Sequence, residues 1–244
     1  MFPQIRRLFF DSSYEIPSDD GYRHEVKYTL TPYEYLKFRD FCAGFMDYDK
    51  NADVDGEYVV KSFYFDTLNY DDYYEKLSGN YERKKYRLRT YNDSGYYRLE
   101  KKMKRGNLNK KLSGEISTED AKRLLHGDMD IQTGNANTDA IISEMYLNRC
   151  RPSNYIEYTR QAFIMKETGL RITFDKEPGV LYGKYNLDEV MPELMPFFYD
   201  GSVILEIKYG DFMPGWIEKA VHRLVPSEFS ISKYAKALQP VLGG

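Results

Sequence analysis

Cysteine and histidine are scarce in this sequence, with two cysteines and three histidines among 244 residues. Cys42 and Cys150 cannot build a disulfide framework and lack the paired spacing of a zinc site, so we expect buried thiols. The histidines are scattered, with no pair at helical spacing, which excludes a histidine-rich metal centre. A metal ion would therefore need carboxylate ligands, which favour hard ions such as Mg²⁺ or Mn²⁺.

Long apolar runs and a positive net charge are absent as well. No stretch approaches the roughly 20 apolar residues of a membrane-spanning helix, and the first residues do not form a secretory signal. We therefore expect neither a transmembrane nor an exported protein, and instead one that lies in the cytoplasm. The net charge is −3, from 35 basic and 38 acidic side chains, which argues against nucleic acid as the partner.

Alternating and β-branched segments predict eight strands with helices between them. The strands are expected over about 22–29, 57–67, 81–91, 96–105, 110–116, 153–165, 169–176 and 202–209. Helices are expected over about 32–43, 68–77, 117–125, 214–224 and 230–238, with another ending near Arg149, whereas the proline-rich segment 177–200 reads as irregular. These patterns indicate an α+β fold, in which an arm (residues 1–20) precedes one antiparallel, barrel-like domain (residues 21–240).

Charged side chains recur at every second position of these strands. Residues i and i+2 share one face of a strand, so each of the following rows lies on a single face. The rows are Arg23, Glu25 and Lys27; Arg87 and Arg89; Arg98, Glu100 and Lys102; Lys111, Ser113 and Glu115; Tyr158 and Arg160; Arg171, Thr173 and Asp175; Glu206 and Lys208. Solvated strand faces are the alternative for any one pair, but Glu206 lies in the apolar run Val203–Tyr209, where an unpaired charge is costly. We therefore expect the charged faces to point into the closed interior.

A cationic interior with a few glutamates suits a short polyanion together with a divalent metal. Guanidinium forks match phosphate oxygens, and carboxylates can hold a metal that bridges to phosphates. Phosphoryl transfer requires mainly positioning and charge stabilisation, so the absence of an evident nucleophilic serine or cysteine is no obstacle. The sequence contains neither a Walker-type phosphate loop nor a kinase signature.

Eight short motifs in one order resemble those of a known family. They are Arg23-x-Glu25-x-Lys27-Tyr28, Ser62-x-Tyr64-Phe65-Asp66, Arg87-x-Arg89-x-Tyr91, Leu99-Glu100-x-Lys102, Tyr158-x-Arg160, Arg171-x-Thr173-x-Asp175, Leu205-Glu206-x-Lys208 and Ser232-Lys233-Tyr234. The set resembles the VTC domain, the polyphosphate polymerase branch of the triphosphate tunnel metalloenzymes, over residues 21–236. The resemblance implies an eight-stranded antiparallel β-barrel, the triphosphate tunnel, with helices packed on its outside. It also implies transfer of the ATP γ-phosphate to a growing polyphosphate chain, with Mn²⁺ or Mg²⁺ as cofactor.

The resemblance also implies a role for each matched residue. The implied catalytic residues are Lys27, Arg87, Arg89, Lys102, Arg160 and Lys208. The implied substrate-binding residues are Lys111 (or its neighbour Lys110), Tyr158, Arg171, Ser232 and Lys233. Glu206 is the main implied metal ligand, whereas Glu25 and Glu100 either join it or pair with neighbouring lysines and orient them.

Other functions compete with the polymerase. The sister CYTH branch, with triphosphatases and nucleotidyl cyclases, typically opens with Glu-x-Glu-x-Lys, and Arg23 at the first position favours the polymerase branch. A third possibility is a non-catalytic receptor for polyphosphate or inositol phosphates. Nucleic-acid binding through the 24 tyrosines is the least favoured, because these are spread over every element. The chain resembles a stand-alone version of the family, so a separate membrane partner would place it at the inner face of a membrane.

Overall fold

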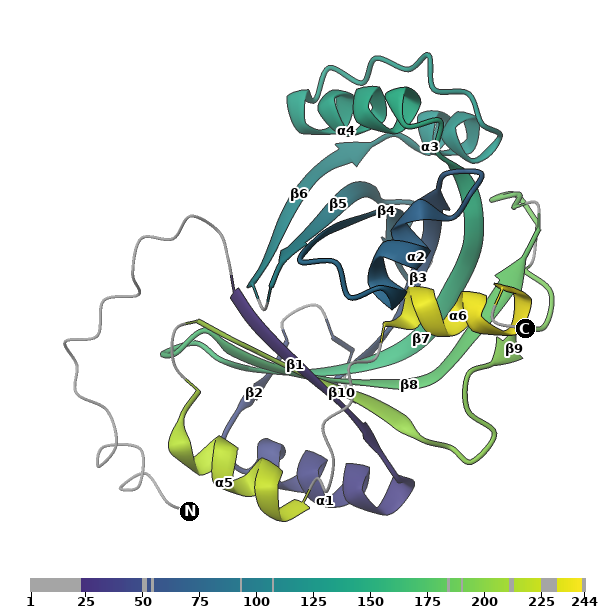
Figure 1. Ribbon diagram of the computed structural model, residues 1–244. Helices are drawn as coiled ribbons and strands as arrows, with labels where there is room; N and C mark the ends of the chain where they lie inside the picture. The colour runs from purple at the N-terminus through teal and green to yellow at the C-terminus, as the bar shows by residue number, and fades with distance from the viewer. Residues whose placement is uncertain are drawn as a thin grey trace.

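The computed structural model describes residues 23–49, 52–53, 55–92, 94–106, 108–183, 185–189, 191–210, 213–224 and 232–242. The arm expected over residues 1–20 lies outside these ranges, and the domain limits at 21 and 240 stay predictions. Within the described ranges the chain forms ten strands and six helices (Figure 1).

Eight strands close into a ring in which every neighbouring pair is antiparallel. The ring order is β7, β3, β4, β5, β6, β1, β10, β8 and back to β7. These strands are β1 (Arg23–Leu30), β3 (Glu57–Asp66), β4 (Glu82–Tyr91), β5 (Tyr97–Arg105), β6 (Leu108–Ile116), β7 (Arg151–Met165), β8 (Leu170–Tyr182) and β10 (Val203–Tyr209). Two-residue strands extend the sheet outside the ring: β2 (Asp47–Tyr48) pairs with β7, and β9 (Met195–Pro196) pairs with β8. The predicted α+β fold with eight antiparallel strands is confirmed as this closed ring.

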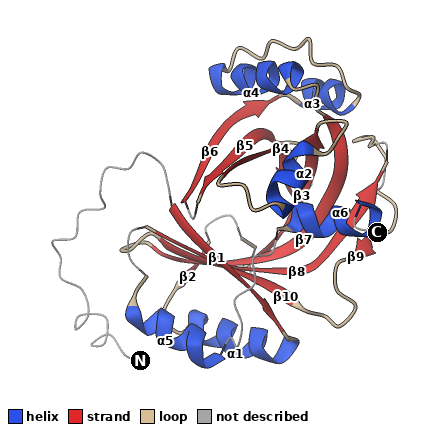
Figure 2. Cartoon of the chain, in the orientation of Figure 1, coloured by secondary structure: helices blue, strands red, loops and turns tan. Residues whose placement is uncertain are grey.

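The helices are α1 (Pro32–Ala43), α2 (Asp71–Leu77), α3 (Thr118–Leu125), α4 (Ala136–Leu147), α5 (Gly215–Leu224) and α6 (Lys233–Leu242). Helices α1, α3, α4 and α5 lie outside the ring of strands, whereas α2 and α6 lie across its opening, and the start of α6 lines the cavity (Figure 2). Thr31 begins α1 with a capping box to Glu34, and Ser117 caps α3, so local sequence fixes both starts. Helices α1 and α5 contact each other, as do α2 and α6. Within the described ranges, no helix is long and apolar enough to cross a bilayer.

Most apolar strand faces point outward, toward α1, α3, α4 and α5, whereas inward apolar residues of β3 and β7 pack against α2 and α6. Leu205 and Ile207 of β10 are fully buried in a cluster with Phe38 of α1 and Ile217 of α5. A second cluster joins β4 and β5 to α3 and α4, and it contains residues such as Leu88, which is also fully buried. Because successive side chains of a strand alternate, this outer packing directs the charged rows into the ring. Both cysteines are buried thiols, as expected.

Strand β8 is longer than the sequence pattern predicts. Residues 177–200 were expected to be irregular, but β8 continues to Tyr182 and contains Pro178. The pairing of β7 with β8 shifts register between Glu157 and Thr159, and Glu177 has φ 48° at this irregularity. Proline is tolerated in a strand at such a bulge because no ladder hydrogen bond is lost there.

Candidate functional site

A cavity of about 370 Å³ lies within the ring. All six residues of the predicted catalytic set line it: Lys27, Arg87, Arg89, Lys102, Arg160 and Lys208. Tyr158, Ser232, Lys233, Glu25 and Glu206 from the other predicted sets also line it. Of the predicted residues, Glu100, Lys111 and Arg171 do not. The strands therefore bring most of the residues singled out in the sequence to one concave site.

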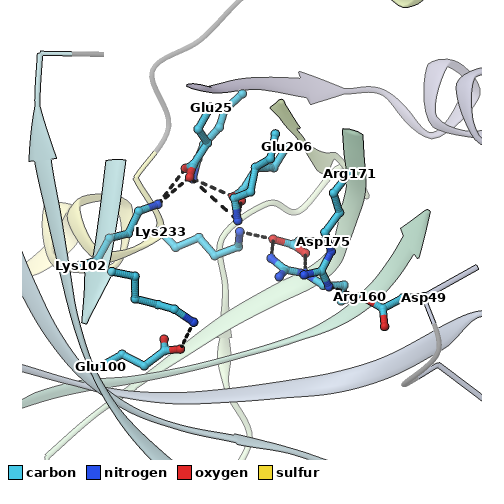
Figure 3. Close-up of polar contacts among 12 residues, drawn as sticks. Glu25, Asp49, Glu100, Lys102, Arg160, Arg171, Asp175, Glu206 and Lys233 are labelled. Carbon is cyan, nitrogen blue, oxygen red and sulfur yellow. Dashed lines mark hydrogen bonds and ion pairs between the residues drawn. The ribbon is translucent and has the colours of Figure 1, made fainter. Parts of the chain in front are cut away.

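Two glutamates and three lysines form an ionic network where β1 pairs with β10. The register sets Lys27 opposite Glu206 and Glu25 opposite Lys208, so opposite charges face each other across the strands. Lys27 Nζ lies 2.6 Å from Glu25 Oε1 and 2.8 Å from Glu206 Oε2. Lys102 Nζ donates to both oxygens of Glu25 at 2.9 and 2.7 Å, and Lys208 pairs with Glu206. Figure 3 shows Glu25, Glu206 and Lys102 converging on this region.

The network fixes the charge state of its members. Burial and the neighbouring Glu206 alone would raise the pKa of Glu25, but Lys27 and Lys102 outweigh them and hold it well below its usual range. Burial would likewise raise the pKa of Glu206, yet the surrounding ammonium groups keep it well below its usual range. Burial lowers the pKa of Lys102 to about 7, against the attraction of Glu25. Both glutamates are thus ionised at neutral pH, whereas Lys102 titrates near it.

Glu100 belongs to a separate cluster. Its carboxylate accepts hydrogen bonds from Arg87 Nε at 2.6 Å and from Lys111 Nζ at 2.8 Å, and Arg89 lies at 4.0 Å. The cations outweigh burial and keep the pKa of Glu100 well below its usual range. These contacts correspond to the second role expected for Glu100, that of orienting neighbouring cations. Lys111 is accordingly held at this carboxylate rather than in the cavity.

Asp175 is a buried acid that the sequence placed in a charged row but not in the site. It accepts hydrogen bonds from Arg160 Nε at 2.6 Å and Nη2 at 2.8 Å, and a further one from Lys233 (Figure 3). Burial alone would raise the pKa of Asp175, but Arg160 and Lys233 lower it to about 2. Asp175 thereby orients two cations of the cavity. Asp175 lies four residues after Arg171, and in a strand this spacing places both side chains on the same, charged face. The sequence therefore already indicated that Asp175 points into the ring.

Arg171 contacts an acid outside the cavity lining. Its Nη2 donates to Asp49 Oδ2 at 2.6 Å and to the hydroxyl of Tyr58 at 2.9 Å. Figure 3 shows this pair apart from Glu25 and Glu206. The structure thus pairs Arg171 with Asp49 and Tyr58, and its substrate contact stays a prediction.

Lys85 and Tyr64 line the cavity but were missed from the sequence. Lys85 Nζ donates to Ser232 Oγ at 2.6 Å, and the Tyr64 ring stacks on Tyr234 with centroids 5.2 Å apart. Lys85 shares its strand face with Arg87 and Arg89, so the two-residue period already indicated its direction. Tyr64 belongs to one of the motifs. Because its strand is apolar on both faces, the sequence does not show whether the Tyr64 side chain points into the ring or outward.

The donor groups near Glu206 fit a hard divalent ion. Within the described ranges, no cluster unites three or more histidine, cysteine, aspartate or glutamate side chains. Glu25 and Glu206 share Lys27, and Thr173, directly opposite Glu206 in the register, has a buried hydroxyl with no hydrogen-bond partner. Mg²⁺ commonly binds one or two carboxylates and completes its shell with water and substrate phosphates. Two ionised carboxylates beside an unpartnered hydroxyl match that requirement.

A closed antiparallel ring with cations and carboxylates inside it is the architecture of the triphosphate tunnel proteins. The model of the VTC domain family matches residues 22–242, and the chain belongs to this family. A search of curated protein sequences finds no match.

Solved structures of other proteins share the fold, and two of them are similar over nearly the whole chain. One is a Hippeastrum protein, described as an adenylyl cyclase candidate with a dominant triphosphatase activity. It is 15% identical, with a TM-score of 0.56, over 90% of this chain and 97% of its own. The other, an adenylate cyclase candidate from Bacillus halodurans, is 10% identical with a TM-score of 0.55, over 91% and 99%. At these identities the likeness concerns the fold alone.

Proposed function

We propose that this protein is a metal-dependent polyphosphate polymerase, which transfers the γ-phosphate of ATP to a growing polyphosphate chain inside the ring. The observation that carries the proposal is the convergence of twelve Lys and Arg side chains, the six predicted catalytic ones among them, on one cavity beside two ionised glutamates. Membership of the VTC family supports the choice of polyphosphate as the acceptor.

The cationic side chains would hold and orient the phosphates. Arg87 and Arg89 offer guanidinium forks from one face of β4, while Lys27, Lys102 and Lys208 act as point charges from β1, β5 and β10. Asp175 holds Arg160 and Lys233, which would bind phosphate groups further along the substrate chain. Tyr158 and Ser232 would donate hydrogen bonds to these phosphates. Such a site accelerates phosphoryl transfer by alignment and by stabilising negative charge.

Glu25 and Glu206 would hold Mg²⁺ or Mn²⁺ together with phosphate oxygens. When bound, the ion supplies charge neutralisation at the transferring phosphate. The two glutamates are ionised without it, because Lys27, Lys102 and Lys208 surround them.

A triphosphatase that uses water as the acceptor is the second candidate. The observation in its favour is the shared fold with the Hippeastrum protein, which is described as having a dominant triphosphatase activity. The same cationic cavity would bind the triphosphate in either reaction, so the candidates differ only in the acceptor.

ATP turnover with a short polyphosphate primer tests the proposal. The protein is incubated with Mg²⁺ or Mn²⁺, and ADP, free phosphate and chain length are measured, beside Glu206→Gln and the exposed control Lys166→Met. We expect chain growth with one ADP per added phosphate, lost in Glu206→Gln and retained in Lys166→Met. Free phosphate without chain growth would identify a triphosphatase, and tight polyphosphate binding without turnover would identify a receptor.

A further inference from the structure

Lys85 extends the cationic row of β4 beyond the two matched arginines. Arg89, Arg87 and Lys85 occupy alternate positions, and all three line the cavity. A strand rises by about 3.3 Å per residue, so each of these side chains lies roughly 6.6 Å beyond the one before it. A phosphate chain lying along β4 would therefore reach Lys85 after passing the arginines.

Four carboxylates inside the ring form ion pairs with cations other than Lys85. Glu25 and Glu206 pair with Lys27, Lys102 and Lys208. Glu100 pairs with Arg87 and Lys111, and Asp175 with Arg160 and Lys233. Among the described residues, Lys85 has no carboxylate within ion-pair distance, although the buried carboxyl of Asp72 attracts it from farther away. The polar contact of Lys85 is the hydroxyl of Ser232, and its ammonium lies 5.5 Å from the centre of the Tyr234 ring.

The register also sets Lys85 directly opposite Lys102. Two ammonium groups facing each other across two strands repel, so the state in which both lysines are charged is unfavourable without an anion. Burial, together with Lys102 and Lys27, lowers the pKa of Lys85 well below its usual value. A phosphate between the two lysines would remove the repulsion and supply the missing counter-charge.

Ser232 adds a second group at the same place. Its Oγ accepts from Lys85 and from the backbone N–H of Ala235 at 3.3 Å, so it caps α6. With both of these contacts formed, the hydroxyl proton of Ser232 is still available for donation to an anion. Lys85 and Ser232 thus bring a cation and a donor together at the start of α6.

We propose that Lys85 binds one phosphate group next to those held by Arg87 and Arg89, and that this subsite makes the protein prefer chains of three or more phosphates to pyrophosphate. The inference rests on the phosphate-binding role of the cavity in the proposed function, but it requires no turnover.

Metal-free calorimetry with pyrophosphate and tripolyphosphate tests the subsite. The proteins are the unmodified chain, Lys85→Met, the charge-retaining Lys85→Arg, and the exposed control Lys166→Met. We expect Lys85→Met to bind tripolyphosphate about tenfold more weakly or worse and pyrophosphate within threefold, because a charge-assisted hydrogen bond is lost. Lys85→Arg should recover most of the affinity, and Lys166→Met should match the unmodified chain.

Equal losses for both ligands, or no loss, would overturn the subsite. Thermal unfolding checks that each variant is folded, and Lys85→Gln replaces Lys85→Met if the latter is not. Arg87→Met separates this inference from the proposed function. If Arg87→Met also binds tripolyphosphate normally, the cavity does not bind phosphate and both fail. If Arg87→Met weakens binding and Lys85→Met does not, only the role of Lys85 is wrong.

Discussion

At the scale of single residues, Asp175 shows how one buried charge organises the cavity. It has no exposed surface, and it holds Arg160 and Lys233. Asp175→Asn would leave both cations without their carboxylate, so we expect a loss of about 3 kcal/mol in the free energy of unfolding at pH 7. Urea denaturation measures this loss.

The pH dependence of this loss has a definite sign. The folded-state pKa of Asp175 is lowered to about 2, so its carboxylate stabilises the fold above pH 4, and this contribution is lost as the pH falls toward 2. The difference between the unmodified chain and Asp175→Asn should therefore shrink across that range. Equal stability of the two proteins at pH 7 would contradict the role given to Asp175.

The lowered pKa of Lys102 predicts that polyanion binding depends on pH. Its pKa is about 7 in the free protein, and a bound phosphate must raise it, so binding takes up a proton above pH 7. We expect metal-free tripolyphosphate affinity to fall by roughly tenfold or more between pH 6 and 8.5. Lys102→Arg keeps its charge, so its pH profile should be flatter, and because the ligand titrates alike in both proteins, the difference isolates Lys102. Parallel profiles would show that Lys102 is not the titrating group.

At the scale of elements, the start of α6 is anchored by a contact between distant parts of the chain. The Tyr234 hydroxyl donates to Asp66, whose oxygens also accept from the backbone N–H groups of Asp72 and Tyr73 in α2. Tyr234→Phe should cost about 1–2 kcal/mol of stability. It should also speed amide hydrogen exchange in α6 but not in α5. Uniform acceleration across both helices would mean that the contact is not a local anchor.

The period-two pattern predicted the strands and the direction of most charged side chains, because alternation is a local property of a strand. Which carboxylate meets which cation depends on register between strands far apart in sequence, and this is why Glu100 differs from Glu25. Lys85 and Asp175 obey the same alternation and were identifiable from it. Strand β8 continues past Pro178 because its pairing with β7 contains a bulge. No local sequence pattern indicates that bulge.

At the scale of the whole molecule, the ring is largely inverted relative to a usual closed sheet, with most of its charged rows inside and most of its apolar faces outside. Filling the cavity with an anion should therefore stabilise the entire fold. At 100 times its dissociation constant, tripolyphosphate should add about 2.7 kcal/mol. For a chain of this size that corresponds to a rise in Tm of roughly 5–10 °C. Sodium chloride at equal ionic strength is the control, and an equal rise with chloride would point to general screening.

The first and the last strand of the ring in sequence order, β1 and β10, pair with each other, and this has a consequence for biosynthesis. The partners β3, β4, β5 and β6 follow one another closely, so they can pair soon after they leave the ribosome. Strand β1 is made before the other strands of the ring, yet β10, which pairs along most of its length, follows about 180 residues later. A nascent chain therefore carries an open sheet with unpaired edges until β10 has been synthesised, and these edges must be protected from aggregation during that interval.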